Sequence, residues 1–312
     1  MERDNFKYLL GIGFFLFSIF AGVFYLGVRP VNQAPPPPSF SFSSPKPKYP
    51  LVTYLPLNFF PASISGLSAA PEISAESGLL YDLTNKKTLF AKEPEKKLLI
   101  ASLTKLMTAL VASENVTDKK QRFFVFEEDL KLENPYPDLR DGDNFSLEEA
   151  FYFILIRSDN VLAQALAKAV FPEGSKFFVF EMNKKAQELK MNNTLFYDPV
   201  GLSNNLSTTM DLKNLTEAIL KSNQEVFLIS KISEIKILSP DNKVFNLKNT
   251  NTLVSRIPGI FGSKTGFTPE ASGSLLVVFK DDKKMVLSVV LGSQDRFGDT
   301  MGLINWYWKN RN

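Results

Sequence analysis

An apolar run opens the chain, and a proline-rich stretch follows it. No residue from Tyr8 to Val28 is charged, and about 20 apolar residues suffice to cross a bilayer as a helix. Prolines then crowd residues 29–50, with an unbroken run from Pro35 to Pro38. Because proline fixes φ and lacks an N–H donor, it interrupts helices and sheet ladders and favours extended polyproline structure. The pattern predicts a membrane helix followed by a semi-rigid spacer.

The residues before the apolar run indicate how the predicted membrane helix is oriented. Arg3 and Lys7 precede it, so the positive-inside rule puts residues 1–7 in the cytoplasm. We expect residues 8–28 to be an uncleaved signal anchor and residues 29–71 to be a Pro-rich extracytoplasmic spacer. A cleaved signal peptide is the alternative, but its apolar region normally has about 7–15 residues and ends at an A-x-A-like site, which this run lacks. The protein is therefore expected to be single-pass in the cytoplasmic membrane, with its main domain outside.

The pattern over residues 72–312 predicts one globular domain. Its elements are ordered as two strands, a helical block, several strands and a last helix. The predicted strands cover residues 77–83, 87–91, 234–238, 244–247, 274–280 and 285–291, and the predicted helices cover 100–112, 147–155, 161–170, 176–189, 211–220 and 298–308. A capping-box sequence at 146–149 supports the second helix. We expect strands from both ends of the domain to share one antiparallel sheet, with the helical block as a side lobe.

Two absences in the composition narrow the chemistry. The chain has no cysteine and no histidine, which excludes thiolate nucleophiles, disulfides, Cys-ligated zinc and a Ser-His-Asp triad. If the protein is a hydrolase, its base must be Lys, Asp, Glu or Tyr. The formal net charge is only +3, so a nucleic-acid partner is not supported. No metal or organic cofactor is implied.

Ser102 and Lys105 form the first candidate pair. They are three residues apart at the start of a predicted helix, so both lie on one face. A serine hydroxyl is a poor nucleophile until a neighbour removes its proton. A lysine can do so only when neutral, which requires burial or a second cation to lower its pKa. The S-x-x-K spacing alone is common and is also found on solvated helix faces.

Two further short motifs follow. The tripeptide Ser-Asp-Asn at 158–160 lies between two apolar helical stretches, where by itself it is also suited to cap a helix. The tripeptide Lys-Thr-Gly at 264–266 precedes a predicted strand. There Lys264 offers a cation to an anionic group, and Gly266 lets a substrate backbone approach closely. In this order, S-x-x-K, S-D-N and K-T-G are the signature of penicillin-binding proteins and class A β-lactamases.

With these motifs, the domain resembles the D-alanyl-D-alanine carboxypeptidase family, the low-molecular-mass penicillin-binding proteins. The similarity covers about residues 72–308, and outside the motifs it is carried by the segments Ile73–Ala75, Ala101–Ala109, Asn193–Leu202, Ser207–Leu212, Gly262–Ala271 and Val289–Gly292. The resemblance implies an α/β fold of the β-lactamase/transpeptidase type, an antiparallel sheet flanked by helices with a mainly helical side lobe. It implies a serine-type D-Ala-D-Ala carboxypeptidase that trims the terminal D-Ala from peptidoglycan stem peptides, with β-lactam antibiotics as covalent inhibitors.

The resemblance also assigns roles to the first two motifs. Ser102 attacks the carbonyl carbon of the terminal D-Ala-D-Ala bond and becomes acylated, and Lys105 accepts its proton. Ser158 relays a proton to the leaving amine. Asn160 holds the substrate amide and Lys105. Water then hydrolyses the acyl-enzyme.

The third motif is assigned to substrate binding. By the same resemblance, Lys264 and Thr265 bind the C-terminal carboxylate of the substrate, with Gly266 beside them. Lys264 also helps to keep Lys105 neutral by like-charge repulsion. The backbone N–H groups of Ser102 and Phe267 form the oxyanion hole.

Three alternatives stay open at this point. A DD-endopeptidase that cuts peptidoglycan cross-links uses the same residues. A β-lactamase-like hydrolase is suggested by the Ser-Asp-Asn motif, but such enzymes need a Glu between the second and third motifs to activate water. No Glu occurs between Glu188 and Glu217, and Asp198 is the only carboxylate before Asp211. A non-catalytic domain that binds penicillin or peptidoglycan is the third, although Ser102 and Lys105 are both present.

Overall fold

The structure is a computed structural model that describes residues 69–240 and 242–311. The predicted cytoplasmic segment 1–7, the predicted membrane segment 8–28 and the predicted spacer up to residue 68 lie outside the described residues. Within the described part of the chain, none of the helices combines the length and the apolar character needed to cross a bilayer.

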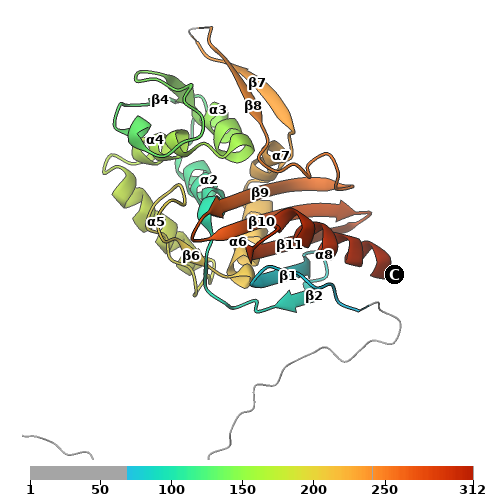
Figure 1. Cartoon of the computed structure of the whole chain (residues 1–312). Coiled ribbons are helices and arrows are strands. Elements are labelled where there is room, and N and C mark those ends of the chain that lie inside the picture. Colours follow the sequence, from blue (N-terminus) through green and yellow to red (C-terminus); the bar gives the residue numbers. More distant parts are fainter. Residues whose placement is uncertain (1–68, 241, 312) are drawn as a thin grey trace, which may run out of the picture. The chain divides into compact units, whose positions relative to one another are not determined.

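A five-stranded antiparallel sheet is the centre of the described domain (Figure 1). Its strands are β1 (Ser77–Asp82), β2 (Lys87–Lys92), β9 (Ile260–Thr268), β10 (Ser272–Asp281) and β11 (Lys284–Ser293), in the order β2-β1-β11-β10-β9. Ser77 is opposite Leu291 and Asp82 is opposite Val286. The prediction that strands from both ends of the domain share one antiparallel sheet is therefore confirmed.

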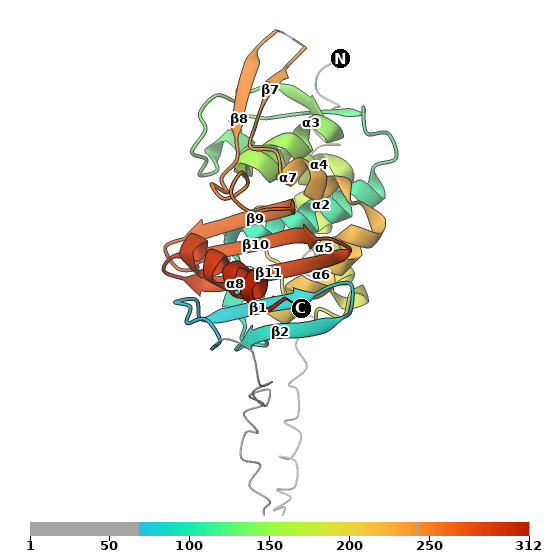
Figure 2. The same ribbon diagram turned by 90° about the vertical axis from the view of Figure 1, so that its right-hand side faces the viewer.

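Both faces of the sheet are covered, which explains why the middle of β10 is a continuous apolar run from Leu275 to Phe279. Leu275, Val277 and Phe279 pack with the C-terminal helix α8 (Arg296–Asn310). The alternate residues Leu276 and Val278 belong to the larger core shared with the helical block. Figure 2 shows α8 lying across one face of the sheet, with α6 and the other helices behind it. Side chains of one strand thus join two separate cores.

The helical block lies between β2 and β9 in the sequence. Its helices are η1 (Ala101–Leu103), α2 (Thr104–Asn115), η2 (Asp129–Lys131), α3 (Leu147–Tyr152), η3 (Phe153–Arg157), α4 (Asn160–Val170), α5 (Ser175–Glu188), α6 (Thr209–Ser222) and α7 (Glu225–Ser230). Three small two-stranded sheets accompany them, formed by β3 (Leu98–Leu99) with β6 (Leu206–Ser207), β4 (Arg122–Phe124) with β5 (Asn144–Ser146), and β7 (Glu234–Leu238) with β8 (Val244–Lys248). Each predicted helix and strand of the domain has a counterpart in the structure, with shifted ends.

Two local details of the motifs differ from the prediction. The Lys-Thr-Gly motif precedes strand β10, as predicted, but it also lies inside a strand that was not predicted, β9, at the edge of the sheet. Its glycines and polar residues have low strand propensity, so the pattern gives no strand signal there. The first helix does not begin as an α-helix at residue 100. Ala101 has φ +44, and Ser102 lies in the 3-10 turn η1 before α2 begins at Thr104.

The segment before the second motif combines two helical forms. Ser146 and Glu149 form the predicted capping box, each side chain accepting from the backbone N–H of the other. α3 then passes into η3, a π-helical turn, and ends at Ser158 with φ +63. Such left-handed backbone costs a non-glycine residue about 1 kcal/mol. The next residue, Asp159, caps α4 by accepting the N–H of Leu162 at 2.9 Å.

A buried carboxylate joins the two ends of the described domain. Asp299, in the first turn of α8, accepts the backbone N–H groups of Ser74 and Ala75, each at 2.8 Å. The hydroxyls of Ser74 and Ser293 also donate to it, at 2.8 and 2.5 Å. Four donors that converge on one carboxylate fix the segment that enters β1.

We expect Asp299→Ala to lower the free energy of unfolding by about 2–4 kcal/mol, because it leaves several buried donors unsatisfied. Asp295→Ala is the matched comparison, since Asp295 caps the same helix by accepting one N–H, that of Gly298. Loss of a single cap costs about 1 kcal/mol. Urea unfolding of the two variants measures the difference, and equal losses would contradict the central role of Asp299.

Candidate active site

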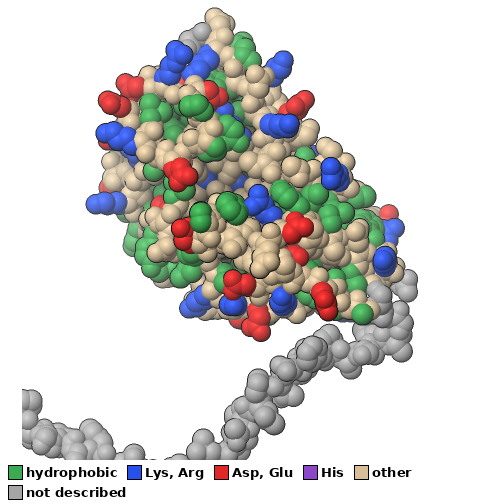
Figure 3. Space-filling model, viewed as in Figure 1, with side chains coloured by type: hydrophobic (Ala, Val, Ile, Leu, Met, Phe, Trp, Pro, Cys, Tyr) green, Lys and Arg blue, Asp and Glu red, His purple; other side chains and the backbone are tan. Residues whose placement is uncertain are grey.

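The three motifs meet where the sheet edge faces the helical block. Ser102 comes from η1, residues 158–160 come from the junction of η3 and α4, and residues 264–266 come from β9. Figure 1 shows β9 as the strand of the large sheet that lies next to α2. Figure 3, in the same view, shows basic side chains in the hollow seam between the sheet and the helical block. The segments are far apart in sequence, and the fold brings them together.

Lys105 is fully buried and has three partners. Its Nζ lies 2.9 Å from Ser102 Oγ, 2.7 Å from Asn160 Oδ1 and 2.7 Å from the carbonyl oxygen of Val200. The amide oxygen and the carbonyl only accept hydrogen bonds. A neutral amine therefore donates its two protons to these oxygens, and its lone pair points at the Ser102 hydroxyl. The geometry is that of a general base next to its nucleophile.

Burial lowers the pKa of Lys105 to about 7, even though the carboxylates of Asp159 and Asp198 act in the opposite direction. Desolvation is therefore the main cause of the low pKa of Lys105, and the like-charge repulsion between Lys105 and Lys264 acts on Lys264. The pKa of Lys264 is also held well below its usual range, first by burial and then by the charges of Lys105 and Arg296.

Lys264 reaches across from β9 to the second motif. Its Nζ donates to Ser158 Oγ at 2.7 Å and to the carbonyl oxygen of Thr265 at 3.0 Å. The hydroxyl of Thr265 lies 2.6 Å from that of Thr250. Thr250, just after β8, gave no signal in the sequence, because a lone Thr in a polar connection has no distinguishing pattern. It fixes the orientation of the Thr265 hydroxyl.

Asn160 is held at both ends of its side-chain amide. Its Oδ1 accepts from Lys105, and its Nδ2 donates to the backbone carbonyl of Glu133 at 2.6 Å. Reversal of the amide would place two donors against each other and two acceptors against each other. Asn160 therefore has one orientation, which presents its oxygen to Lys105.

The turn at 198–203 is hydrogen bonded to α2 through the carbonyls of Pro199 and Val200, and it was not assigned a role from the sequence. The carboxylate of Asp198 accepts the backbone N–H groups of Val200, Gly201 and Ser203. Its oxygens are therefore used to shape the turn, which directs the Val200 carbonyl at Lys105.

Two glycines allow the nucleophile segment to sit close to its neighbours. A Cβ on Gly201, which has φ +90, would lie 2.0 Å from the carbonyl oxygen of Ala101. A Cβ on Gly266 would lie 2.8 Å from the carbonyl oxygen of Ile100 and 3.3 Å from the backbone nitrogen of Ser102. Gly266 was expected to admit a substrate backbone. In the structure its missing side chain admits the backbone that carries Ser102.

The end of β9 carries an exposed ring beside a half-buried cation. Phe267 is 62% exposed, and the guanidinium carbon of Arg296 lies 5.6 Å from its ring centroid. Arg296 Nη1 also donates to the carbonyl oxygen of Gly266 at 3.4 Å. Arg296 begins α8 and was not singled out in the sequence, where it is one basic residue among many. It adds positive charge next to Lys264.

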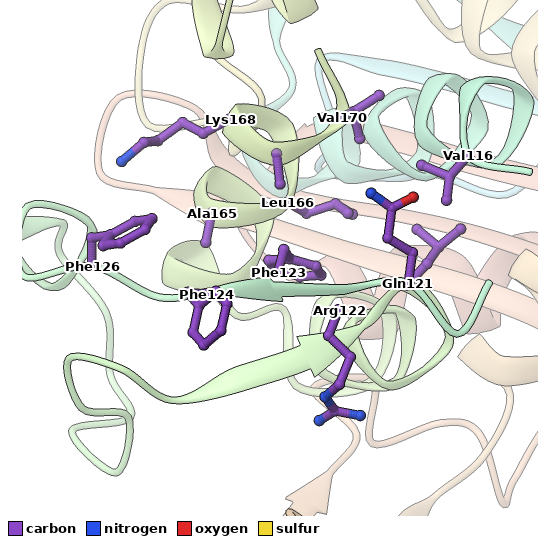
Figure 4. A pocket seen from close by; sticks show the side chains of 12 residues that line it. Val116, Gln121, Arg122, Phe123, Phe124, Phe126, Ala165, Leu166, Lys168 and Val170 are labelled. Carbon is purple, nitrogen blue, oxygen red and sulfur yellow. The ribbon is translucent and has the colours of Figure 1, made fainter. Parts of the chain in front are cut away.

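A second hollow lies apart from these residues. A groove of about 300 Å³ opens between β4 and α4, and Figure 4 shows Phe123, Phe124, Phe126 and Leu166 along it. None of the motif residues lines it. Among residues 69–240 and 242–311, no group of three or more acidic side chains is placed to hold a metal ion.

A buried lysine base beside a half-buried serine, on a sheet covered by helices, defines an active-serine acyl-transfer enzyme that works without histidine. Residues 65–295 match the peptidase family described as D-alanyl-D-alanine carboxypeptidase. The chain belongs to this family.

Three similar proteins illustrate the relationship. The D-alanyl-D-alanine endopeptidase of Escherichia coli is 32% identical over 271 residues, which cover 82% of this chain and 86% of the relative. The D-alanyl-D-alanine carboxypeptidase DacF of Bacillus subtilis is 31% identical over 70% of this chain and 57% of its own length. The structure of penicillin-binding protein D2 from Listeria monocytogenes, in its ampicillin-bound form, has a TM-score of 0.69 at 27% identity, covering 77% of this chain and 100% of that one.

The pKa of about 7 for Lys105 predicts the pH dependence of acylation. Below this pH the ammonium has no lone pair to accept the Ser102 proton, so the second-order rate constant for acylation falls about tenfold per pH unit. Above it the rate reaches a plateau. Measurement of acylation by penicillin between about pH 5 and 9 tests this, and a rate that is constant from pH 5 to 8 would contradict a lysine base.

Proposed function

We propose that the protein hydrolyses the terminal D-Ala-D-Ala bond of peptidoglycan stem peptides through an acyl-enzyme on Ser102. The family supports the activity, and one observation in the site supports the mechanism. That observation is the contact of 2.9 Å between Lys105 Nζ and Ser102 Oγ, with the other two partners of Nζ being obligate acceptors.

In the acylation step, Ser102 Oγ attacks the carbonyl carbon while its proton passes to Lys105. The new Oγ–C bond forms a tetrahedral intermediate, whose oxyanion faces the N–H groups of Ser102 and Phe267. The C–N bond then breaks, the leaving D-Ala amine takes a proton from Ser158, and the proton that Lys105 accepted replaces it on Ser158. The Ser158 hydroxyl is free to donate, because it already accepts a hydrogen bond from Lys264 at 2.7 Å.

The deacylation step restores the enzyme. Lys105 takes a proton from a water molecule as the water oxygen attacks the acyl carbon. The Oγ–C ester bond then breaks, the Lys105 ammonium returns this proton to Ser102 Oγ, and the shortened peptide leaves with a new carboxyl group. Atoms and charges balance without a metal or an oxidant.

Substrate recognition follows from the position of the third motif in an edge strand. β9 pairs only with β10 in the large sheet, and an extended peptide can add to an exposed strand edge. Lys264 and Thr265 would bind the C-terminal carboxylate of the substrate, with Arg296 adding positive charge beside Phe267. Penicillin carries a carboxylate in a similar relation to its reactive carbonyl, which supports β-lactams as covalent inhibitors.

Cleavage of cross-links is the second candidate. It is favoured by the name of the Escherichia coli relative, a D-alanyl-D-alanine endopeptidase that aligns over 82% of this chain. The chemistry is the same, and only the leaving amine differs. It belongs to free D-Ala in the carboxypeptidase reaction and to the second, cross-linked peptide in the endopeptidase reaction.

The uncharged run from Tyr8 to Val28 supports membrane anchoring. We place residues 1–7 in the cytoplasm, residues 8–28 in the cytoplasmic membrane and the domain outside it, held away by the Pro-rich segment. We expect the full-length protein to stay with washed membranes in alkaline carbonate and to be released by detergent. Release by carbonate alone would contradict a spanning segment.

Ser102→Ala is expected to abolish both acylation and hydrolysis. Incubation of the full-length protein with penicillin should add one penicilloyl group, visible by intact mass, and this adduct should be absent from the variant. Digestion of linear pentapeptide and cross-linked muropeptides, followed by chromatography, then separates carboxypeptidase from endopeptidase activity. Circular dichroism is the control for folding, and the spectrum of Ser102→Ala should match that of the wild type.

Other outcomes have defined meanings. Rapid penicillin turnover without a lasting adduct would favour a β-lactamase-like hydrolase. If the folded wild type shows neither an adduct nor turnover, the protein is a non-catalytic domain and the proposed mechanism is wrong.

A further inference from the structure

Arg157, the residue directly before Ser158, is a buried cation next to the site. Its side chain is 1% exposed, and a buried charge is unfavourable unless it is paired and fully hydrogen bonded. Nη1 and Nη2 donate to the two oxygens of Asp138, at 2.7 and 2.9 Å. Nε and Nη2 donate to Asp159 Oδ2, at 3.1 and 2.8 Å. One guanidinium thus joins two carboxylates from different parts of the chain.

Two aromatic rings complete the surroundings of this guanidinium. Its carbon lies 4.5 Å from the ring centroid of Tyr136 and 4.7 Å from that of Phe153. Tyr136 and Asp138 belong to the connection between η2 and β5, whereas Phe153 belongs to η3. Arg157 therefore ties this connection to the helical turn that leads into the second motif.

The ion pair between Arg157 and Asp159 spans Ser158. Ser158 has the unfavourable left-handed conformation with φ +63, and its Oγ accepts from Lys264 at 2.7 Å. A bond between the residues on either side of Ser158 stabilises this tight turn. It thereby fixes the direction of the Ser158 hydroxyl.

The connection between η2 and β5 also contacts Asn160, and through Asn160 it is linked to the base Lys105. The backbone carbonyl of Glu133 accepts from Asn160 Nδ2 at 2.6 Å, and Asn160 Oδ1 accepts from Lys105 at 2.7 Å. As long as the carbonyl of Glu133 is in place, the Asn160 amide cannot rotate. The bidentate pair with Asp138 holds the segment that supplies this carbonyl.

We propose that Arg157 and Asp138 form a clamp that positions Ser158 and Asn160, and through Asn160 the base Lys105. The proposal rests on the proposed function, since it concerns the acylation of Ser102. Arg157 is a positioning residue in this scheme and contacts neither the substrate nor the reacting atoms. Asp138, whose side chain is 40% exposed, closes the clamp from the solvent side.

Asp138→Asn is the variant that tests the clamp, because Arg157→Ala would leave a buried carboxylate without its partner and is expected to prevent folding. We expect Asp138→Asn in the full-length protein to lower the rate constant for acylation by penicillin about tenfold, as misplaced catalytic groups do. The acidic limb of the pH profile should move to lower pH, because the Lys105 ammonium loses its fixed acceptor on Asn160. Asp138→Glu keeps the carboxylate and should recover most of the rate.

Glu127→Gln is the matched control, since it removes one exposed carboxylate from the same region and should leave rate and pH profile unchanged. Two results would overturn the clamp. One is acylation of Asp138→Asn within about twofold of wild type, with the same pH profile. The other is a slower rate with an unmoved acidic limb and a lower melting temperature, which indicates a purely structural role. A wild type that is never acylated would contradict the proposed function instead.

Discussion

The site depends on a lysine amine that is kept out of water. Lys105 is 0% exposed, and desolvation shifts its pKa into the range where a neutral amine is available. The elements around Lys105 keep its amine out of water and supply its hydrogen-bond partners. α2 carries the lysine itself, the turn after Asp198 supplies the Val200 carbonyl, and α4 supplies Asn160. A chain without histidine therefore obtains a base near neutral pH through burial.

The geometry around the base is set mostly by groups that do no chemistry. Backbone carbonyls of Val200 and Glu133 fix Lys105 and Asn160. Left-handed residues precede or begin the catalytic segments, at Ala101 and Ser158. Strain of this kind persists only where the surrounding contacts over-determine the backbone. The close approach at Gly201 and Gly266 and the ion pairs of Arg157 provide those contacts.

The sequence predicted the strongly periodic elements and the motif residues, and it missed what depends on the assembled fold. β10 and β11 are long apolar runs, and the capping box at Ser146 is a local signal that the structure confirms. β9 was missed because its glycines, Ser263 and Lys264 lack strand propensity. The two-residue strands β3 and β6 are too short for any periodicity. Val200 contributes only a backbone oxygen, which no side-chain pattern can reveal.

The pairing of β1 with β11 has a consequence for how the domain is made. Ser77 is opposite Leu291, so β1 cannot take its place beside β11 until the helical block and β11 have been synthesised. Until then β1 and β2 form at most an isolated hairpin, which is only marginally stable in water. Pairing over such a separation raises the contact order and slows folding. The large sheet can thus be completed only after β11 has been made.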